Sequence, residues 1–147
     1  MKFTCEVEID LGIERVVELF QDPENIKYWQ PGLLKREPIS GENGLPGSKA
    51  RMTIRVGSRD IEMIETITVR NPPHEFSGTY DAKGVFNVVS NYFSPITPHK
   101  TKYVSQQEFR FSGFMKAIGV MMPDLFRKTS LQLMSQFKEF AEKSVLH

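Results

Sequence analysis

Between residues 34 and 113 the chain repeats one pattern, in which apolar and polar residues alternate and short turn-forming segments separate the runs. No run with helical spacing interrupts this stretch. Alternation with a period of two is typical of half-buried strands, and strands joined in sequence by short turns pair antiparallel. The stretch therefore predicts an antiparallel sheet. The six runs that we assign to strands are Leu34–Ser40, Ala50–Val56, Ile61–Arg70, Glu75–Tyr80, Val85–Phe93 and Tyr103–Phe111.

Glycine and proline residues predict where this sheet is interrupted. Gly41–Gly47 is expected to form a loop, and Asn71–Pro73 forces a turn. Ser94–Lys100 contains two prolines and is also expected to be a loop. Pro38 lies inside the first run, which favours an edge strand or a bulge at that point.

Both ends of the chain depart from this central pattern. Lys2–Asp10 alternates and predicts one more strand, and two segments with helical character follow it, Ile13–Phe20 and Glu24–Trp29. After Gly113 the pattern is helical and amphipathic over roughly 20 to 30 residues. Pro123 either begins a helix at its first turn or kinks a helix that began earlier.

One sheet and one long amphipathic helix have a simple packing solution in a chain of this length. The sheet curves, and the apolar stripe of the helix covers its open face. We therefore predict a single domain over residues 1–147, of the α+β class and with a helix-grip arrangement. It has a curved antiparallel sheet of about six to seven strands, two short helices after the first strand, and a long C-terminal helix closing an internal cavity.

Three short motifs, together with the order of the elements, resemble a known superfamily. Phe20–Asn25 (FQDPEN) followed by Tyr28 and Trp29 resembles a helix end, a break and a Trp-bearing second helix. Phe111–Phe114 (FSGF) and Gln136–Ala141 (QFKEFA) are similar to the segments that open and close the last helix. The superfamily is the START-like, polyketide cyclase/dehydrase (SRPBCC) group. The resemblance implies a cavity that takes sterols, lipids, polyketides or hormones, and it does not select among carriers, cyclases, receptors and co-chaperones.

The low net charge and the small number of potential metal ligands argue against several other classes of function. The formal net charge is +1 and basic residues are mixed with acidic ones, so we expect no nucleic-acid partner. Cys5 is the single cysteine, and His74, His99 and His147 lie far apart, so we expect no disulfide, no metal and no cofactor. The ligands of the iron-sulfur members of the superfamily have no match here.

Hydropathy gives an expectation about location. No apolar run approaches the roughly 20 residues that are needed to span a bilayer. We therefore expect a cytoplasmic protein without stable membrane insertion. The sequence leaves the oligomeric state open.

Glu65 is the clearest polar candidate on a predicted inward face, because it is in phase with Met63 and Ile67. Burial of a carboxylate favours its neutral form, which suits a general acid or base. The alternative is structural: Arg51 or Arg55 on the neighbouring strand pairs with the carboxylate, or a bulge reverses the phase. Both interpretations stay open.

Amide and hydroxyl side chains follow two later strands. Ser105 and Gln107 are in phase with Tyr103, so they are expected to face the interior and to offer hydrogen bonds to a ligand. Asn87 and Asn91 share a phase with apolar residues, but the opposite phase of that strand buries about as many. The sequence therefore does not decide which face of the strand points inward. In the alternative interpretation, such polar side chains pair with each other and fix the strand register.

Ligand pockets in proteins are mostly apolar with a few convergent polar groups. Trp29 is either a core anchor or a surface on which a ligand stacks. The methionines have flexible thioethers that adapt to varied apolar ligands, and Met121 and Met122 beside Pro123 are candidates for a flexible gate. The predicted ligand contacts are Trp29, Met52, Met63, Glu65, Asn87, Tyr103, Gln107, Met122 and Phe126.

Three functions fit these observations. The first is binding or carriage of a small hydrophobic ligand (lipid, polyketide or steroid-like) in an internal cavity. The second is a cyclase, dehydratase or isomerase of polyketide-like substrates, with Glu65 as acid or base and Gln107 or Tyr103 as its partner. The third is a protein-interaction module that uses the groove, which predicts an exposed apolar patch. Solid packing beneath the last helix would contradict the first two.

Overall fold

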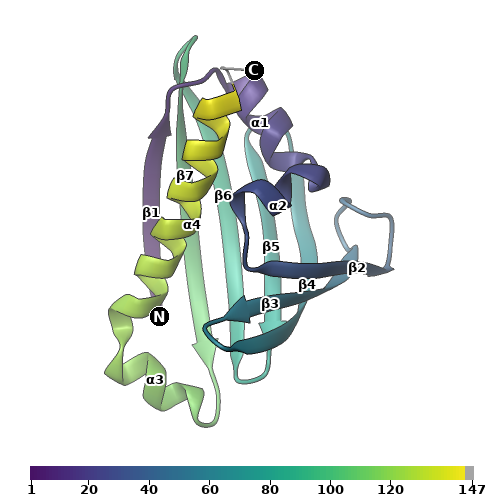
Figure 1. Ribbon diagram of the computed structural model, residues 1–147, viewed down its shortest axis with the longest axis vertical. Coiled ribbons are helices and arrows are strands. Elements are labelled where there is room, and N and C mark those ends of the chain that lie inside the picture. The colour runs from purple at the N-terminus through teal and green to yellow at the C-terminus, as the bar shows by residue number, and fades with distance from the viewer. Residues whose placement is uncertain (145–147) are drawn as a thin grey trace.

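A computed structural model describes residues 1–144, which form one antiparallel sheet with helices on its concave side (Figure 1). Within these residues the sheet has seven strands in the order β1-β7-β6-β5-β4-β3-β2. The strands are β1 (Lys2–Ile9), β2 (Leu33–Ser40), β3 (Lys49–Val56), β4 (Arg59–Asn71), β5 (Glu75–Ala82), β6 (Val85–Thr97) and β7 (Lys100–Phe111). The predicted α+β helix-grip fold is confirmed. His147 lies outside the described residues.

The helices follow β1 and β7, as the sequence predicts. They are α1 (Ile13–Gln21), the 3-10 turn η1 (Pro23–Asn25), α2 (Ile26–Trp29), α3 (Met115–Met121) and α4 (Pro123–Lys143). Pro123 occupies the first turn of α4, where its missing N–H costs no helical hydrogen bond. Of the two alternatives for this proline, the structure therefore shows the helix start, and α3 is a separate helix.

The hairpin of β6 and β7 is longer than predicted. We expected a loop over Ser94–Lys100, but β6 continues to Thr97 and β7 begins at Lys100. The pairing of β5 with β6 ends where Glu75 lies opposite Tyr92, so Pro95 has no β5 residue beside it. A proline at such a position costs no hydrogen bond to a third strand, which explains why the strand continues through it.

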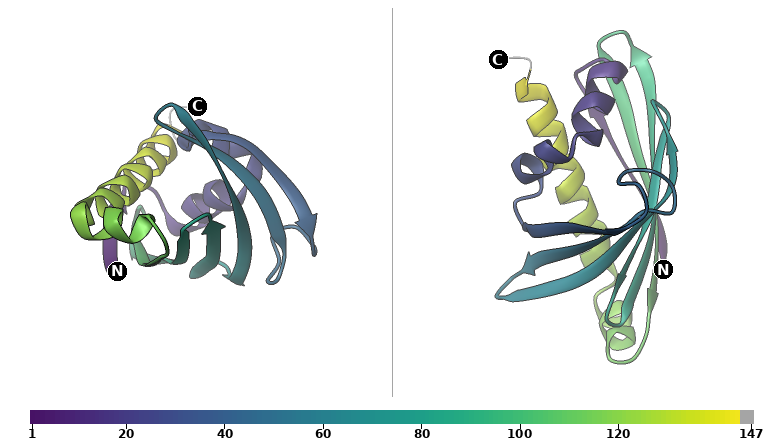
Figure 2. Two further views of the ribbon diagram at one scale, coloured as in Figure 1. Left: turned by 90° about the horizontal axis from the view of Figure 1, so that it is seen from below. Right: turned by 90° about the vertical axis from the view of Figure 1, so that its right-hand side faces the viewer.

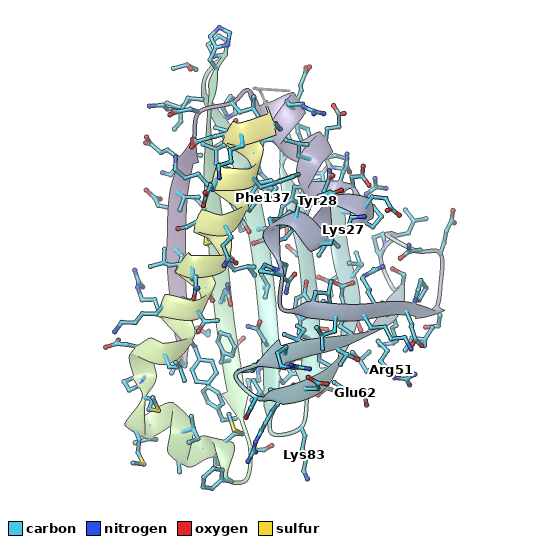
Figure 3. The ribbon with its side chains drawn as sticks, in the orientation of Figure 1. Lys27, Tyr28, Arg51, Glu62, Lys83 and Phe137 are labelled. Atoms are coloured by element: carbon cyan, nitrogen blue, oxygen red, sulfur yellow. The ribbon has the colours of Figure 1, made fainter. Side chains whose placement is uncertain are left out.

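An aromatic cluster closes the interior near α1 and α2. We use this name for five residues from five elements: Phe20, Trp29, Phe93, Tyr103 and Phe137. The ring centroids of Phe93 and Tyr103 are 4.6 Å apart, and those of Trp29 and Phe137 are 5.2 Å apart. Phe137, on α4 beside α2 (Figure 3), has 0% of its surface exposed. Full burial of such a side chain contributes about 1.5–3 kcal/mol.

The C-terminal half of α4 is also fastened to β1 by hydrogen bonds. Lys138 Nζ donates to the Glu8 carbonyl oxygen at 2.6 Å and to Glu142 Oε2 at 2.8 Å. The backbone N–H of Asp10 donates to the same Glu142 oxygen at 2.8 Å. Burial acts to raise the pKa of Glu142, but these hydrogen bonds outweigh it and hold the pKa below its ordinary value.

The other end of the molecule is formed by α3, which packs through two close contacts (Figures 1 and 2). A Cβ at position 119 would lie 2.8 Å from the Phe111 ring, and a Cβ at position 84 would lie 2.8 Å from Met115 Cγ. Glycine at both positions therefore lets α3 lie against the end of β7 and the β5–β6 turn. Any larger residue there would push the helix away.

Candidate ligand-binding site

The strand register arranges side chains in rows across the concave face of the sheet. Alternate residues of a strand share a face, so Phe109 and Phe111 face the same side as buried Tyr103. One row comprises Phe109, Asn87, Tyr80, Glu65 and Ala50, and the next comprises Phe111, Val85, Ala82, Met63 and Met52. We call these two rows the inner wall. Neighbouring strands lie about 4.8 Å apart, so the distance from Phe109 to Glu65 is about 14 Å.

The inner wall is more accessible than the aromatic cluster. Phe109, Asn87, Tyr80 and Met63 are only partly buried, although they face the concave side. At the far end of the rows the side chains are buried again, and Met52 on β3 is only 4% exposed. The interior beneath the last helix is therefore filled by aromatic rings near α1 and α2, whereas toward α3 the inward-facing side chains keep part of their surface exposed.

Glu65 lies at the inner end of this wall and pairs with an arginine from β2. Its side chain faces the concave side, as predicted, and the residue is 9% exposed. Arg36 Nη2 donates to Glu65 Oε1 at 2.9 Å, and Arg36 Nε donates to the same oxygen at 3.2 Å. Arg36 Nη2 also lies 3.2 Å from Asn43 Oδ1. The guanidinium is therefore held by two partners, and the carboxylate charge is compensated inside the sheet.

The structural alternative for Glu65, an arginine partner, is observed, but its expected partners Arg51 and Arg55 were wrong, and strand parity explains why. On β3 the even-numbered residues Ala50 and Met52 face the concave side, so both arginines face outward. Arg55 pairs with Asp60 instead. Arg36 reaches Glu65 from two strands away because the residue between them, Ala50, is small.

Tyr80 completes this cluster. Its hydroxyl donates to Glu65 Oε2 at 3.0 Å. Burial raises the pKa of Tyr80 well above its ordinary value, and the nearby Glu65 carboxylate raises it further. The phenol thus stays protonated and remains a donor over the whole physiological range. Arg36, Glu65 and Tyr80 form what we call the polar cluster, of which the sequence analysis had identified only Glu65.

The structure resolves the open question about β6: Asn87 and Asn91 face inward. Tyr103 Oη donates to Asn91 Oδ1 at 3.2 Å, and Asn87 Nδ2 donates to the Glu108 carbonyl oxygen at 3.1 Å. Burial raises the pKa of Tyr103, so this phenol is also a neutral donor.

On β7, Gln107 Nε2 lies 3.2 Å from Ser105 Oγ, so these two polar side chains are partners as the structural interpretation predicts. Ser105 is buried, and Gln107 is only partly buried. Their mutual hydrogen bond holds both side chains on the concave face beside Asn91 and Val89.

An apolar recess of about 530 Å³ opens at the α3 end of the inner wall. Phe126 is not part of its lining, but it packs against two residues that are, Phe109 and Phe111, with ring centroids 4.9 and 5.0 Å from its own. The recess is open to solvent. Its lining residues are Met1, Glu108, Phe109, Arg110, Phe111, Lys116, Gly119 and Val120.

A second, smaller recess of about 260 Å³ lies between η1, α2 and β2, and Arg36 is part of its lining. Nearby, Trp29 packs in the aromatic cluster. Within residues 1–144, its Nε1 is the one buried side-chain polar atom without a hydrogen-bond partner. A buried donor of this kind usually has a water or a ligand as its partner.

The predicted ligand contacts separate into three groups. Met52, Met63, Glu65 and Asn87 belong to the inner wall, and Phe126 packs against its α3 end. Tyr103, Gln107 and Trp29 lie in or beside the aromatic cluster. Met122 is exposed at the junction of α3 and α4 and is not part of the recess lining.

The comparison with family models decides the broader relationship of the chain. The model described as "Polyketide cyclase / dehydrase and lipid transport" matches residues 1–142. The chain belongs to this family. No functionally curated protein matches the chain. Within residues 1–144 of this chain, no helix is both long enough and apolar enough to cross a membrane.

Solved structures show the same fold at low sequence identity. A conserved protein from Geobacillus kaustophilus superposes with a TM-score of 0.83 at 18% identity, covering 98% of this chain and 97% of that one. The Zhui aromatase/cyclase from Streptomyces sp. R1128 gives 0.81 at 14% identity, over 99% and 95%. A START superfamily protein from Mycobacterium smegmatis gives 0.79 at 15% identity, over 97% of both chains. Solved structures with this fold thus include an aromatase/cyclase and a START superfamily protein.

Proposed function

We propose that this protein binds and carries a small apolar molecule of lipid, polyketide or steroid type along the inner wall. The observation that carries the proposal is the partial exposure of inward-facing side chains between the α3 recess and the polar cluster. An apolar surface of this kind gains free energy when a ligand removes it from water. The family description, which names lipid transport, supports the same class of ligand.

The two ends of the inner wall differ in polarity, and this difference predicts the orientation of the bound ligand. Phe109, Phe111 and Phe126 offer an apolar surface at the α3 end. At Glu65, about 14 Å away across three strand spacings, Arg36 and Tyr80 offer hydrogen-bond donors. The ligand therefore has an apolar body and one oxygen-bearing end, which exchanges hydrogen bonds with the polar cluster.

Binding is tested with a matched pair of tryptophan substitutions on β5. Ala82 is on the inner wall, whereas the preceding residue, Asp81, faces outward and is exposed. In titrations with a dansyl-labelled fatty acid, Ala82→Trp should weaken binding about tenfold or more, because the indole fills the wall. The affinity of Asp81→Trp for the same fatty acid should stay within about twofold of that of the unsubstituted protein. Equal affinities for both variants would contradict the proposed location.

Catalysis is the second candidate, and one observation favours it. Tyr80 Oη lies 3.0 Å from Glu65 Oε2, so a neutral donor and a carboxylate are adjacent at the end of the wall. Such a pair suits a cyclase, dehydratase or isomerase, in which the carboxylate moves a proton and the phenol polarises a carbonyl. Against this, Arg36 occupies the other carboxylate oxygen, which favours a structural role for the charge.

Glu65→Gln separates carrier from enzyme. In a carrier the amide keeps a hydrogen-bonding end at the wall, so affinity for the dansyl fatty acid changes by about threefold at most. In an enzyme the same change abolishes turnover of polyketide-like substrates while binding persists. Native mass spectrometry of protein purified from its own host identifies the mass of a co-purifying ligand and thereby its class.

A further inference from the structure

The segment that joins β7 to α4 exposes an unusual number of apolar side chains. Phe114 is 79% exposed, Val120 is 81% exposed and Met121 is 77% exposed. Met122 and Leu125 are exposed as well. Large apolar patches are rare on soluble monomers and usually mark an interaction surface. We call these five residues the tip patch.

The exposure follows from how α3 is attached. The helix uses Gly119 and Met115 to contact Phe111 and the β5–β6 turn, and these close contacts occupy one side of it. Val120 and Met121 lie on the helix surface that these contacts leave uncovered. In Figures 1 and 2, α3 lies at one end of the molecule, beyond the end of the sheet.

Basic side chains lie on the elements next to the tip patch. Lys116 lies on α3, Lys128 lies on the second turn of α4, and Lys83 lies in the β5–β6 turn at the same end (Figure 3). Over residues 1–144, none of these three has a carboxylate within 4.0 Å. From residue 112 to residue 130, Asp124 is the only acidic residue.

We propose that the tip patch docks the protein reversibly onto phospholipid bilayers that contain anionic lipids. The apolar side chains enter the boundary between headgroups and acyl chains, and the surrounding cations lie at the level of the phosphates. This inference goes beyond ligand carriage and does not depend on it. A protein without an inner-wall ligand would still bind the bilayer.

The size and shape of the patch favour a bilayer over a protein partner. A stable protein interface uses about 20–30 residues from each side. The tip patch has five apolar residues on a projecting seven-residue helix and its neighbours. A fluid bilayer deforms around such a projection, and charge complementarity with anionic headgroups explains the surrounding lysines.

The tip patch adjoins the apolar recess, because Val120 belongs to the patch and also lines the recess. Docking therefore brings the mouth of the recess to the depth of the acyl chains. If the proposed ligand carriage holds, this geometry provides a path for an apolar molecule between bilayer and inner wall that avoids water.

Vesicle co-sedimentation tests the docking. The unsubstituted protein should sediment with vesicles of phosphatidylcholine that contain about one-third phosphatidylglycerol, and only weakly with pure phosphatidylcholine. The double variant Val120→Asp, Met121→Asp should lose about tenfold or more of this affinity. The matched control is Val56→Asp, at an exposed apolar residue of the β3–β4 hairpin, which should bind as the unsubstituted protein does.

Replacing Lys83 and Lys116 by Glu should lower affinity for the anionic vesicles by about fivefold or more per lysine.

Three outcomes would overturn the proposal. One is failure of the unsubstituted protein to sediment with either vesicle. Another is equal loss of binding for the tip variant and for Val56→Asp. The third is a dimer in sedimentation velocity that Val120→Asp, Met121→Asp dissociates, because the tip patch would then be covered by a second copy of the chain. Circular dichroism checks the folding of each variant, and all of them should be folded because the substituted residues are exposed.

Discussion

The two ends of the interior use the same kind of side chain for different purposes. Near α1 and α2, Phe93, Tyr103 and Phe137 pack against one another and exclude solvent. Near α3, Phe109 and Phe126 also contact each other, but both keep part of their surface exposed. Within residues 1–144, the hydrogen bond that Lys138 donates to β1 lies at the closed end of α4. Stability is thus concentrated at one end of the helix, and accessible apolar surface at the other.

Alanine substitution at the two ends should show the largest difference. Phe137→Ala should lower the free energy of unfolding by about 3–5 kcal/mol, because it leaves a cavity in the aromatic cluster. Phe126→Ala should cost about 1–2 kcal/mol, because its side chain is partly exposed already. Urea unfolding measures both. Equal costs would show that the α3 end is packed as tightly as the aromatic cluster.

The polar cluster should show the next largest effect. Glu65→Ala leaves Arg36 and Tyr80 without their partner and should lower the free energy of unfolding by about 2–3 kcal/mol, somewhat less than for a fully buried pair. The matched control is Glu62→Ala on the same strand, whose side chain is exposed (Figure 3), and whose effect should be within about 0.5 kcal/mol. A small effect at Glu65 would mean that the ion pair contributes little.

Alkaline pH should weaken the fold through the phenol of Tyr80, which donates to Glu65. The pKa of Tyr80 is raised above its ordinary value of 10.0 in the folded protein. The unfolded chain therefore loses this proton first as the pH rises, and stability falls from about pH 10 upward. One such group contributes a slope of up to about 1.4 kcal/mol per pH unit. Urea unfolding of Tyr80→Phe should show a shallower decline, and an identical decline would contradict the assignment.

The smallest effect is expected at the tip patch. Val120→Ser removes an apolar group that is already in water, so the free energy of unfolding should change by less than about 0.5 kcal/mol. Thermal unfolding is sufficient to detect a larger change. A loss of about 2 kcal/mol or more would show that Val120 is buried in solution, against the arrangement at the α3 end.

The sequence was sufficient for the element order and for much of the inward face. Period-two alternation placed Glu65, Met63 and Gln107 on the concave side correctly, because one face of each strand is apolar. It left β6 undecided, because Phe86, Val88 and Tyr92 on its outer face are also apolar, and they remain partly buried there. Which face of β6 points inward is determined only by its pairing with the neighbouring strands β5 and β7.

The parts of the site that the sequence missed depend on contacts across several strands. The pairing of Arg36 with Glu65 requires the register of β2, β3 and β4 together, and β2 has register shifts at Leu33–Lys35 and at Pro38–Ser40. Tyr80 meets Glu65 only through the β4–β5 register. The sequence predicts a ligand contact at Met122, but the residue is exposed because α3 ends there and a separate helix begins at Pro123.

Methionine methyl NMR tests the contrast between the two ends most directly. Met52 and Met63 lie on the inner wall, whereas Met134 is buried in the closed end. On titration of methyl-labelled protein with oleate, we predict large shifts for Met63 and Met52 and none for Met134. Shifts at Met134 with an unaffected Met63 would contradict the account, because the ligand would then occupy the end that we describe as filled.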